Sequence, residues 1–196
     1  MENFNNVLDF ARKTIEIELD SLGKLTEFLD ENFPRAVQAI LQSKGRVVIT
    51  GIGKSAIIAQ KMVATMNSTG TPAIFMHAAD AIHGDLGMIQ PSDVVICISK
   101  SGNTPEIKVL VPLLKREGNP LIAITANKES FLATQSDYVL YAYTEREACP
   151  NNLAPTTSTT SQLVIGDALA VALMQVKQFG SADFAKYHPG GALGKR

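Results

Sequence analysis

The chain has 196 residues, of which 45% are hydrophobic and 19% are charged, so it can bury a core and is not intrinsically disordered. Its 18 basic and 19 acidic residues give a formal net charge of -1, which supplies no global attraction for nucleic acid or for an acidic membrane. The 2 cysteines are too few for a disulfide framework and fit a reducing, cytoplasmic location. We expect one domain over residues 1–196, with no nucleic-acid or membrane partner.

Helices are predicted before the first strand. Apolar residues recur at helical spacing from residue 7 to residue 41, with Pro34 as a break, so residues 1–44 should form two or three helices. From residue 45 onward, short β-branched runs alternate with helical segments. We predict strands at 46–50, 72–76, 94–99, 121–125 and 138–143, and helices at 55–68, 105–116 and 162–179.

This alternation places the chain in the α/β class, with a parallel sheet of five strands covered by helices on both faces. The sheet and its covering helices occupy residues 45–196. The longest apolar stretch, 163–174, is interrupted by Asp167 and is too short to span a membrane. The tail, residues 187–196, is rich in glycine and should not be helical.

Ligands bind beyond the carboxyl ends of parallel strands, so the first loop of interest is 50–55, which contains Gly53, Lys54 and Ser55. Its glycines and the following helix start suit an anion, although they could also form only a tight turn. A triphosphate-binding loop would need glycine in place of Val48. A dinucleotide site would need an acidic residue where the next strand ends in His77.

The second loop, 99–106, is more specific. Thr104 should cap a helix that begins at Pro105, but capping does not explain the hydroxyl and amide side chains gathered around one glycine, which are Ser99, Ser101, Gly102, Asn103 and Thr104. A third segment before the last long helix adds Ser158, Thr159 and Thr160, with a capping box from Thr159 to Gln162. Three hydroxyl-rich segments around one crevice predict a site for a phosphomonoester with sugar-like hydroxyls.

Three residues could transfer protons, namely Glu106, Glu147 and His188, although each taken alone could be only structural or solvated. Together with a phosphate cradle and no acidic cluster for a metal, they favour proton abstraction next to a carbonyl. His83, beside Asp85, could bind an adventitious metal that is not essential, or form only a local hydrogen bond.

Six motifs now resemble those of the arabinose-5-phosphate isomerases of the sugar isomerase (SIS) superfamily: residues 51–55, 83–88, 99–104, 147–150, 154–160 and 188–194. The resemblance implies a three-layer α/β/α sandwich with a five-stranded parallel, flavodoxin-like sheet, usually a homotetramer. It also implies interconversion of D-ribulose 5-phosphate and D-arabinose 5-phosphate through an enediol, without a cofactor, for the sugar acid Kdo of lipopolysaccharide or capsule. Most relatives continue into a pair of CBS modules, which the chain as given lacks.

The resemblance also implies residue roles. The counterparts of Lys54, Glu106, Glu147 and His188 are implicated in catalysis, and the Ser/Thr loops hold phosphate. Which glutamate acts as the base stays open, because both lie near the predicted cradle. The activated sugar CMP-Kdo is a candidate feedback ligand, since it carries a phosphate and a carboxylate that an anion cradle could accept.

Other functions remain as alternatives at this point. The same superfamily supplies sugar-phosphate sensor domains to transcription regulators, but no basic stripe for DNA accompanies this one. A dinucleotide-binding oxidoreductase is opposed by His77. An isomerase of another sugar phosphate is also compatible with these residues.

Overall fold

The computed structural model describes residues 6–190. Helix α1 (Val7–Leu25), the short 3-10 helix η2 (Thr26–Phe28) and helix α2 (Asn32–Gln42) precede the sheet, as predicted. The predicted break at Pro34 is wrong, because this residue is the third of α2. A helix accepts proline in its first turn, where the backbone N–H has no partner within the helix.

Five parallel strands form one sheet in the order β2-β1-β3-β4-β5, which confirms the predicted fold class. Every residue of β1, β3 and β4 is buried, as expected for the central strands of a sheet covered on both faces. The strands are β1 (Val47–Gly51), β2 (Ala73–His77), β3 (Val94–Ile98), β4 (Leu121–Thr125) and β5 (Tyr138–Tyr141).

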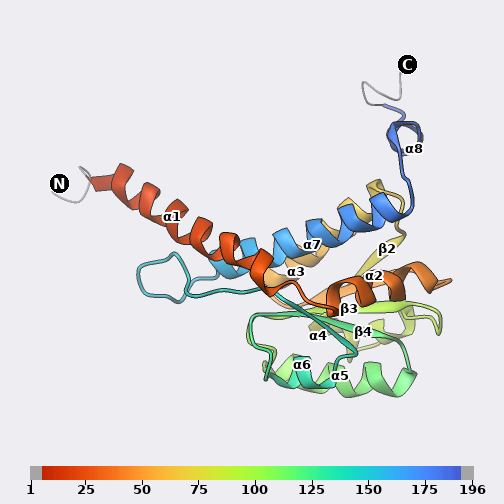
Figure 1. The fold of residues 1–196 in the computed structure, drawn as a ribbon. Helices are drawn as coiled ribbons and strands as arrows, with labels where there is room; N and C mark the ends of the chain where they lie inside the picture. Colours follow the sequence, from red (N-terminus) through yellow and green to blue (C-terminus); the bar gives the residue numbers. More distant parts are fainter. Residues whose placement is uncertain (1–5, 191–196) are drawn as a thin grey trace.

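Helices cover the two faces of the sheet (Figure 1). Helices α2, α3 (Lys54–Ser68) and α7 (Thr157–Val176) pack on one face. Helices α4 (Ala78–Ala81), α5 (Pro105–Glu117) and α6 (Phe131–Gln135) pack on the other, and the 3-10 helix η3 (Asp85–Met88) follows α4. The result is the three-layer sandwich.

The start of α7 differs from the prediction. The helix begins at Thr157 with Thr156 as its N-cap, five residues before the predicted start at Gln162. The predicted capping box from Thr159 to Gln162 is therefore wrong, and the Thr159 hydroxyl instead donates to the Thr156 carbonyl (2.8 Å). Hydroxyl side chains can bond to backbone carbonyls of the preceding turn, so a Ser/Thr-rich run can be helical rather than a loop.

The C-terminal part adds a helix that the sequence did not suggest, α8 (Ser181–Tyr187). Tyr187, predicted to lie in a non-helical tail, is therefore helical, whereas residues 188–190 are not. Residues 191–196 of the predicted tail lie outside the described residues.

Within residues 6–190, α7 is the one helix long and apolar enough to cross a membrane by length and composition. Its side chains Ile165, Leu169 and Leu173 are buried in the core on the sheet, and Gly166 lies against Met62 of α3. These contacts are those of a core helix in the sandwich.

Candidate active site

The sheet order reverses between β1 and β3, so the loops that follow these two strands lie side by side at the carboxyl edge. Two polar contacts attach α7 and the segment before it to these loops. Ser55 Oγ donates to Gln162 Oε1 (3.1 Å), and Lys100 Nζ donates to Glu147 Oε1 (2.6 Å). The structure therefore brings the three sequence-predicted segments together.

The loop after β3 is folded around Gly102. Its backbone has a φ of +62°, and its N–H donates to Ser99 Oγ (3.1 Å). Asn103 Oδ1 accepts a hydrogen bond from the Phe131 N–H (3.0 Å), which fixes the loop against α6. Thr104 is the N-cap of α5 as predicted, but its Oγ1 is buried without a hydrogen-bond partner. An unpartnered hydroxyl at a helix N-terminus suits an anion.

Two glycines in these loops allow a matched test of the loop geometry. A Cβ at Gly102 would lie 2.6 Å from the Ser130 Cβ, whereas a Cβ at Gly53 (φ +57°) would meet nothing within 4 Å. We expect Gly53→Ala to cost about 1–3 kcal/mol, because a residue with a Cβ rarely adopts the backbone angles of Gly53 (φ +57°, ψ −128°). Gly102→Ala should cost roughly 1–3 kcal/mol more through overpacking. Urea unfolding of both variants measures the difference, and equal losses would contradict the crowding seen at Gly102.

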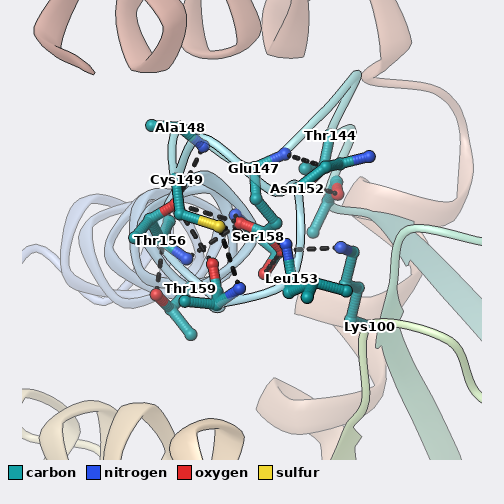
Figure 2. A network of polar contacts seen from close by, with 12 residues as sticks. Lys100, Thr144, Glu147, Ala148, Cys149, Asn152, Leu153, Thr156, Ser158 and Thr159 are labelled. Carbon is teal, nitrogen blue, oxygen red and sulfur yellow. Dashed lines mark hydrogen bonds and ion pairs between the residues drawn. The ribbon is translucent and has the colours of Figure 1, made fainter.

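Glu147 is the most tightly held group at this edge. It is buried, and its carboxylate accepts five hydrogen bonds. Oε1 accepts from Lys100 Nζ and from Ser158 Oγ (2.5 Å), while Oε2 accepts from the N–H groups of Thr156 (2.8 Å) and Ser158 (3.1 Å) and from Thr156 Oγ1 (3.2 Å). Figure 2 shows the carboxylate between the first turn of α7 on one side and Lys100 on the other.

These contacts set the charge of Glu147. Burial alone would raise its pKa, but the hydrogen bonds from Lys100, Ser158 and Thr156 outweigh burial and lower the pKa to about 2. The carboxylate is therefore ionised at neutral pH, and with all five donors in place it is a weak base.

Glu147 should make stability pH-dependent. The pKa of Glu147 is lower in the folded state than in the unfolded state, where it is near 4.5. Its contribution to the free energy of unfolding is therefore complete above pH 4.5 and is lost as the pH falls toward about 2. Glu147→Gln lacks this contribution, so the gap in unfolding free energy between wild type and variant, at most about 3 kcal/mol near pH 7, should narrow between pH 5 and pH 3. Urea unfolding across this range measures the gap. A gap independent of pH would contradict the lowered pKa.

The other predicted catalytic groups of these loops lie at the same edge. Lys54 is the first residue of α3 and is exposed, and Glu106 is half-buried in the first turn of α5. Lys54 comes after β1 in the chain and Glu106 comes after β3, and these are the two strands between which the sheet order reverses.

The hydroxyls at the start of α7 are engaged within the chain. Ser158 donates to Glu147, Thr159 donates to the Thr156 carbonyl, and the Thr160 hydroxyl lies within hydrogen-bond distance of Glu18 (3.2 Å) and the Thr156 carbonyl (3.1 Å). Phosphate binding by these three residues stays a prediction, and their observed contacts instead hold Glu147 and the helix start.

His188 lies away from this edge within one chain. It follows α8, where its ring stacks on Phe184 (centroids 3.8 Å apart) and its Nδ1 is 2.8 Å from the Phe184 carbonyl. The preceding end of α7 is fixed at the amino end of β2, because Lys177 Nζ donates to the Gly70 carbonyl (3.1 Å). Helix α7 has 20 residues, so about 30 Å separates its two ends. Figure 1 shows α8 beyond the C-terminal end of α7, whereas Glu147 contacts the other end.

His83 is exposed, on the segment between α4 and η3. Within residues 6–190, no group of three or more His, Cys, Asp or Glu side chains is placed to hold a metal ion. Adventitious metal binding at His83 stays a prediction.

Sequence reasoning missed the residues that hold Glu147, namely Lys100, Asn152 and Thr156. Asn152 Oδ1 accepts a hydrogen bond from the Glu147 N–H (2.7 Å), which fixes the backbone beside the carboxylate. Lys100 lies between two serines of the predicted cradle, and this position in the sequence is the signal that could have identified it as a site residue. Its partner is 47 positions away in the sequence and could not be identified from spacing.

Fold and site define a sugar isomerase domain: the chain belongs to the SIS domain family, which matches residues 40–172. It is similar to arabinose 5-phosphate isomerase KdsD of Pseudomonas aeruginosa, with 50% identity over 197 residues that cover 99% of this chain and 60% of the relative. It is also similar to arabinose 5-phosphate isomerase KpsF of Escherichia coli, with 52% identity over 187 residues that cover 95% of this chain and 59% of the relative.

A solved structure of similar extent is that of Escherichia coli CFT073 c3406 in complex with arabinose 5-phosphate, with a TM-score of 0.90 and 41% identity. That match covers 94% of this chain and 98% of the other. The chain spans about three fifths of the length of the two curated relatives.

Proposed function

We propose that this domain interconverts D-ribulose 5-phosphate and D-arabinose 5-phosphate. The observation that carries the proposal is the convergence of an anion cradle, Ser99–Thr104 at the N-terminus of α5, with the ionised Glu147 at the sheet's reversal point. Two curated relatives named arabinose 5-phosphate isomerase, at 50% and 52% identity, support the substrate, as does the solved structure in complex with arabinose 5-phosphate.

The chemistry needs no net oxidant. A base removes the proton from C2 of the open-chain aldose, and the electron pair forms the C1–C2 double bond while the C1 carbonyl bond opens and its oxygen takes up a proton, which gives an enediol. The C2 hydroxyl then loses its proton and becomes the ketone as the double bond breaks and a proton is delivered to C1. Ser99, Ser101 and Thr104 would hold the phosphate with the start of α5. Lys54, exposed at the start of α3, would stabilise negative charge on the enediolate oxygen.

A carboxylate, Glu147 or Glu106, would move the carbon proton. Glu147 is placed by five hydrogen bonds, which suits the precise positioning that proton transfer requires. Glu106 lies in the first turn of α5, beside the cradle. Removal of the C2 proton is therefore the step that distinguishes the two glutamates.

His188 would open the sugar ring or move protons between oxygens, and another copy of the chain would supply it. Its position beyond the far end of α7 supports this arrangement. Apolar side chains exposed along α1 supply a surface for assembly, and they include Val7, Leu8, Phe10, Ile15 and Leu19. A homotetramer is the assembly that we propose.

The place of the reaction follows from the same proposal. The product would enter synthesis of Kdo for lipopolysaccharide or capsule in the cytoplasm. CMP-Kdo would compete with substrate, because its phosphate could occupy the cradle of Ser99, Ser101 and Thr104. Steady-state inhibition at varied ribulose 5-phosphate tests this point, and inhibition that is not competitive would contradict it.

A discontinuous assay that offers ribulose 5-phosphate beside a panel of other pentose and hexulose phosphates tests the main proposal. Arabinose 5-phosphate should be the product, with kcat/KM highest for this pair. Binding of sugar phosphates without turnover would indicate a sensor domain instead. Turnover of another sugar phosphate alone would overturn the proposed substrate.

A further inference from the structure

Lys100 connects the loop after β3 with the buried carboxylate of Glu147. Four of the five hydrogen bonds to the Glu147 carboxylate come from Thr156 and Ser158, which lie in the same segment at the start of α7. The fifth comes from Lys100, which belongs to the loop after β3 and stands between Ser99 and Ser101 of the cradle. One ammonium group therefore lies in the predicted phosphate loop while it pairs with a buried carboxylate.

We propose that Lys100 is a positioning residue whose ammonium moves from Glu147 to the phosphate of the substrate, so that phosphate binding releases the carboxylate for proton transfer. This inference rests on the proposed function and adds to it a coupling between phosphate recognition and catalysis.

The backbone of Lys100 is fixed, while its side chain can move. Its carbonyl accepts hydrogen bonds from the Ala126 N–H (3.0 Å) and from Thr125 Oγ1 (3.1 Å), at the end of β4. The Lys100 side chain is 42% exposed, whereas that of Glu147 is fully buried. A lysine carries a point charge on a flexible stem, so its ammonium can change partners without movement of the loop.

The charges favour the exchange. A sugar phosphate carries up to two negative charges near pH 7, and Glu147 carries one, so the phosphate is the stronger competitor for one ammonium. The same cradle offers hydroxyls and the N-terminus of α5, which hold the phosphate close to Lys100.

The exchange would leave Glu147 in place but change its basicity. The four hydrogen bonds from Thr156 and Ser158 keep its orientation after Lys100 leaves. Loss of the cation and arrival of a nearby anion both favour the protonated form, so both raise the pKa of Glu147 from about 2. Lys13, Arg146 and Cys149 line a cavity with Glu147, and among the described contacts none of them donates to its carboxylate. Phosphate binding would therefore turn a weak base into a stronger one.

A double-mutant cycle on phosphate binding tests the exchange without relying on activity. Calorimetry measures the affinity of inorganic phosphate for wild type, Lys100→Met, Glu147→Gln and the double variant. In wild type Glu147 competes with phosphate for Lys100, so Glu147→Gln should tighten binding about tenfold, the equivalent of one charge-assisted hydrogen bond. Lys100→Met should weaken binding by about the same factor.

The decisive comparison is Glu147→Gln in the absence of Lys100. On the Lys100→Met background, Glu147→Gln should tighten phosphate binding only about twofold, because it then removes only the direct repulsion between the carboxylate and the phosphate, which salt screens. Equal tightening on both backgrounds would overturn the inference, because Lys100 would then be only a structural partner of Glu147. Phosphate affinity unaffected by Lys100→Met, or absent in wild type, would overturn it as well.

Two controls guard against misfolding. Lys115→Met breaks an exposed ion pair with Asp137 (2.8 Å) on α5, away from the cradle, and should leave phosphate affinity unchanged. Lys100→Arg keeps the charge and should bind phosphate more tightly than Lys100→Met. If Lys100→Met unfolds, Lys100→Gln, which also removes the charge, replaces it in the cycle, and equal tightening by Glu147→Gln with and without that change would overturn the inference.

Kinetics separate this inference from the proposed function. With arabinose 5-phosphate, Lys100→Met should raise KM through the lost phosphate contact while kcat at saturation stays close to that of wild type, because Glu147 is then free of the cation with or without phosphate. A kcat lowered by Lys100→Met in an enzyme that still isomerises the substrate would remove the exchange and leave the proposed function intact. If the four phosphate affinities follow the expected pattern but the protein has no isomerase activity, the proposed function is wrong and the charge exchange stands.

Discussion

Glu147→Gln is expected to lower kcat for the interconversion of ribulose 5-phosphate and arabinose 5-phosphate by at least ~100-fold, because general-base catalysis typically contributes that much. Glutamine keeps the size of the side chain and can still accept a hydrogen bond from the α7 amides that now hold the carboxylate. Substrate binding should therefore survive. Steady-state kinetics with both sugar phosphates measure the effect, and turnover close to wild type would exclude Glu147 as a base.

The matched variant is Glu106→Gln, which changes the other candidate in the same way at the start of α5. Both variants should lose turnover, but only loss of the base for carbon should stop exchange of the C2 proton with solvent. Incubation of arabinose 5-phosphate in D₂O, followed by NMR, separates the two roles. Retained exchange in Glu147→Gln together with lost exchange in Glu106→Gln would assign the base to Glu106.

The fold could be predicted from local patterns because the signals are short-range. The prediction gives β4 its observed bounds and places β1 within one residue at each end, since short, buried runs rich in β-branched residues leave few other arrangements. The errors have local causes too. Proline usually ends a helix, but the first turn of α2 accepts Pro34. Hydroxyl residues usually indicate loops, but here they form the first turn of α7.

The site was predictable only in part, because its chemistry depends on contacts between distant segments. Glu147 was identified as a candidate, but nothing in the sequence shows that Lys100 and Ser158 neutralise and hold it. The hydroxyls at the start of α7 were assigned to phosphate by composition, whereas the structure shows Ser158 bound to Glu147. Burial and long-range pairing decide such roles, and neither is encoded in spacing.

A second large effect should appear when two inactive variants are combined. His188→Ala and Glu147→Gln should each be nearly inactive, and mixed oligomers formed after dissociation and reassembly should recover activity if the two residues meet across an interface. The reason is geometric, since His188 follows the end of α7 that is fixed at the amino end of β2, while Glu147 contacts the opposite end. In a mixed oligomer some sites would combine an intact glutamate from one copy with an intact histidine from another.

The fraction of activity that the mixed oligomers recover can be compared with an expected value. For random mixing in equal amounts, about one quarter of the sites would contain both intact residues, by the statistics of subunit pairing at a shared site. Mixing Glu147→Gln with Glu106→Gln is the matched control, because both variants should lose turnover and both glutamates lie at the same edge of one chain, so no site could regain both from different copies. Verified mixed oligomers that stay as inactive as this control would place His188 and Glu147 in the same subunit's site. That outcome would require α8 and residue 188 to move across the length of α7, so unchanged inactivity would contradict the described position of His188 rather than only the proposed assembly.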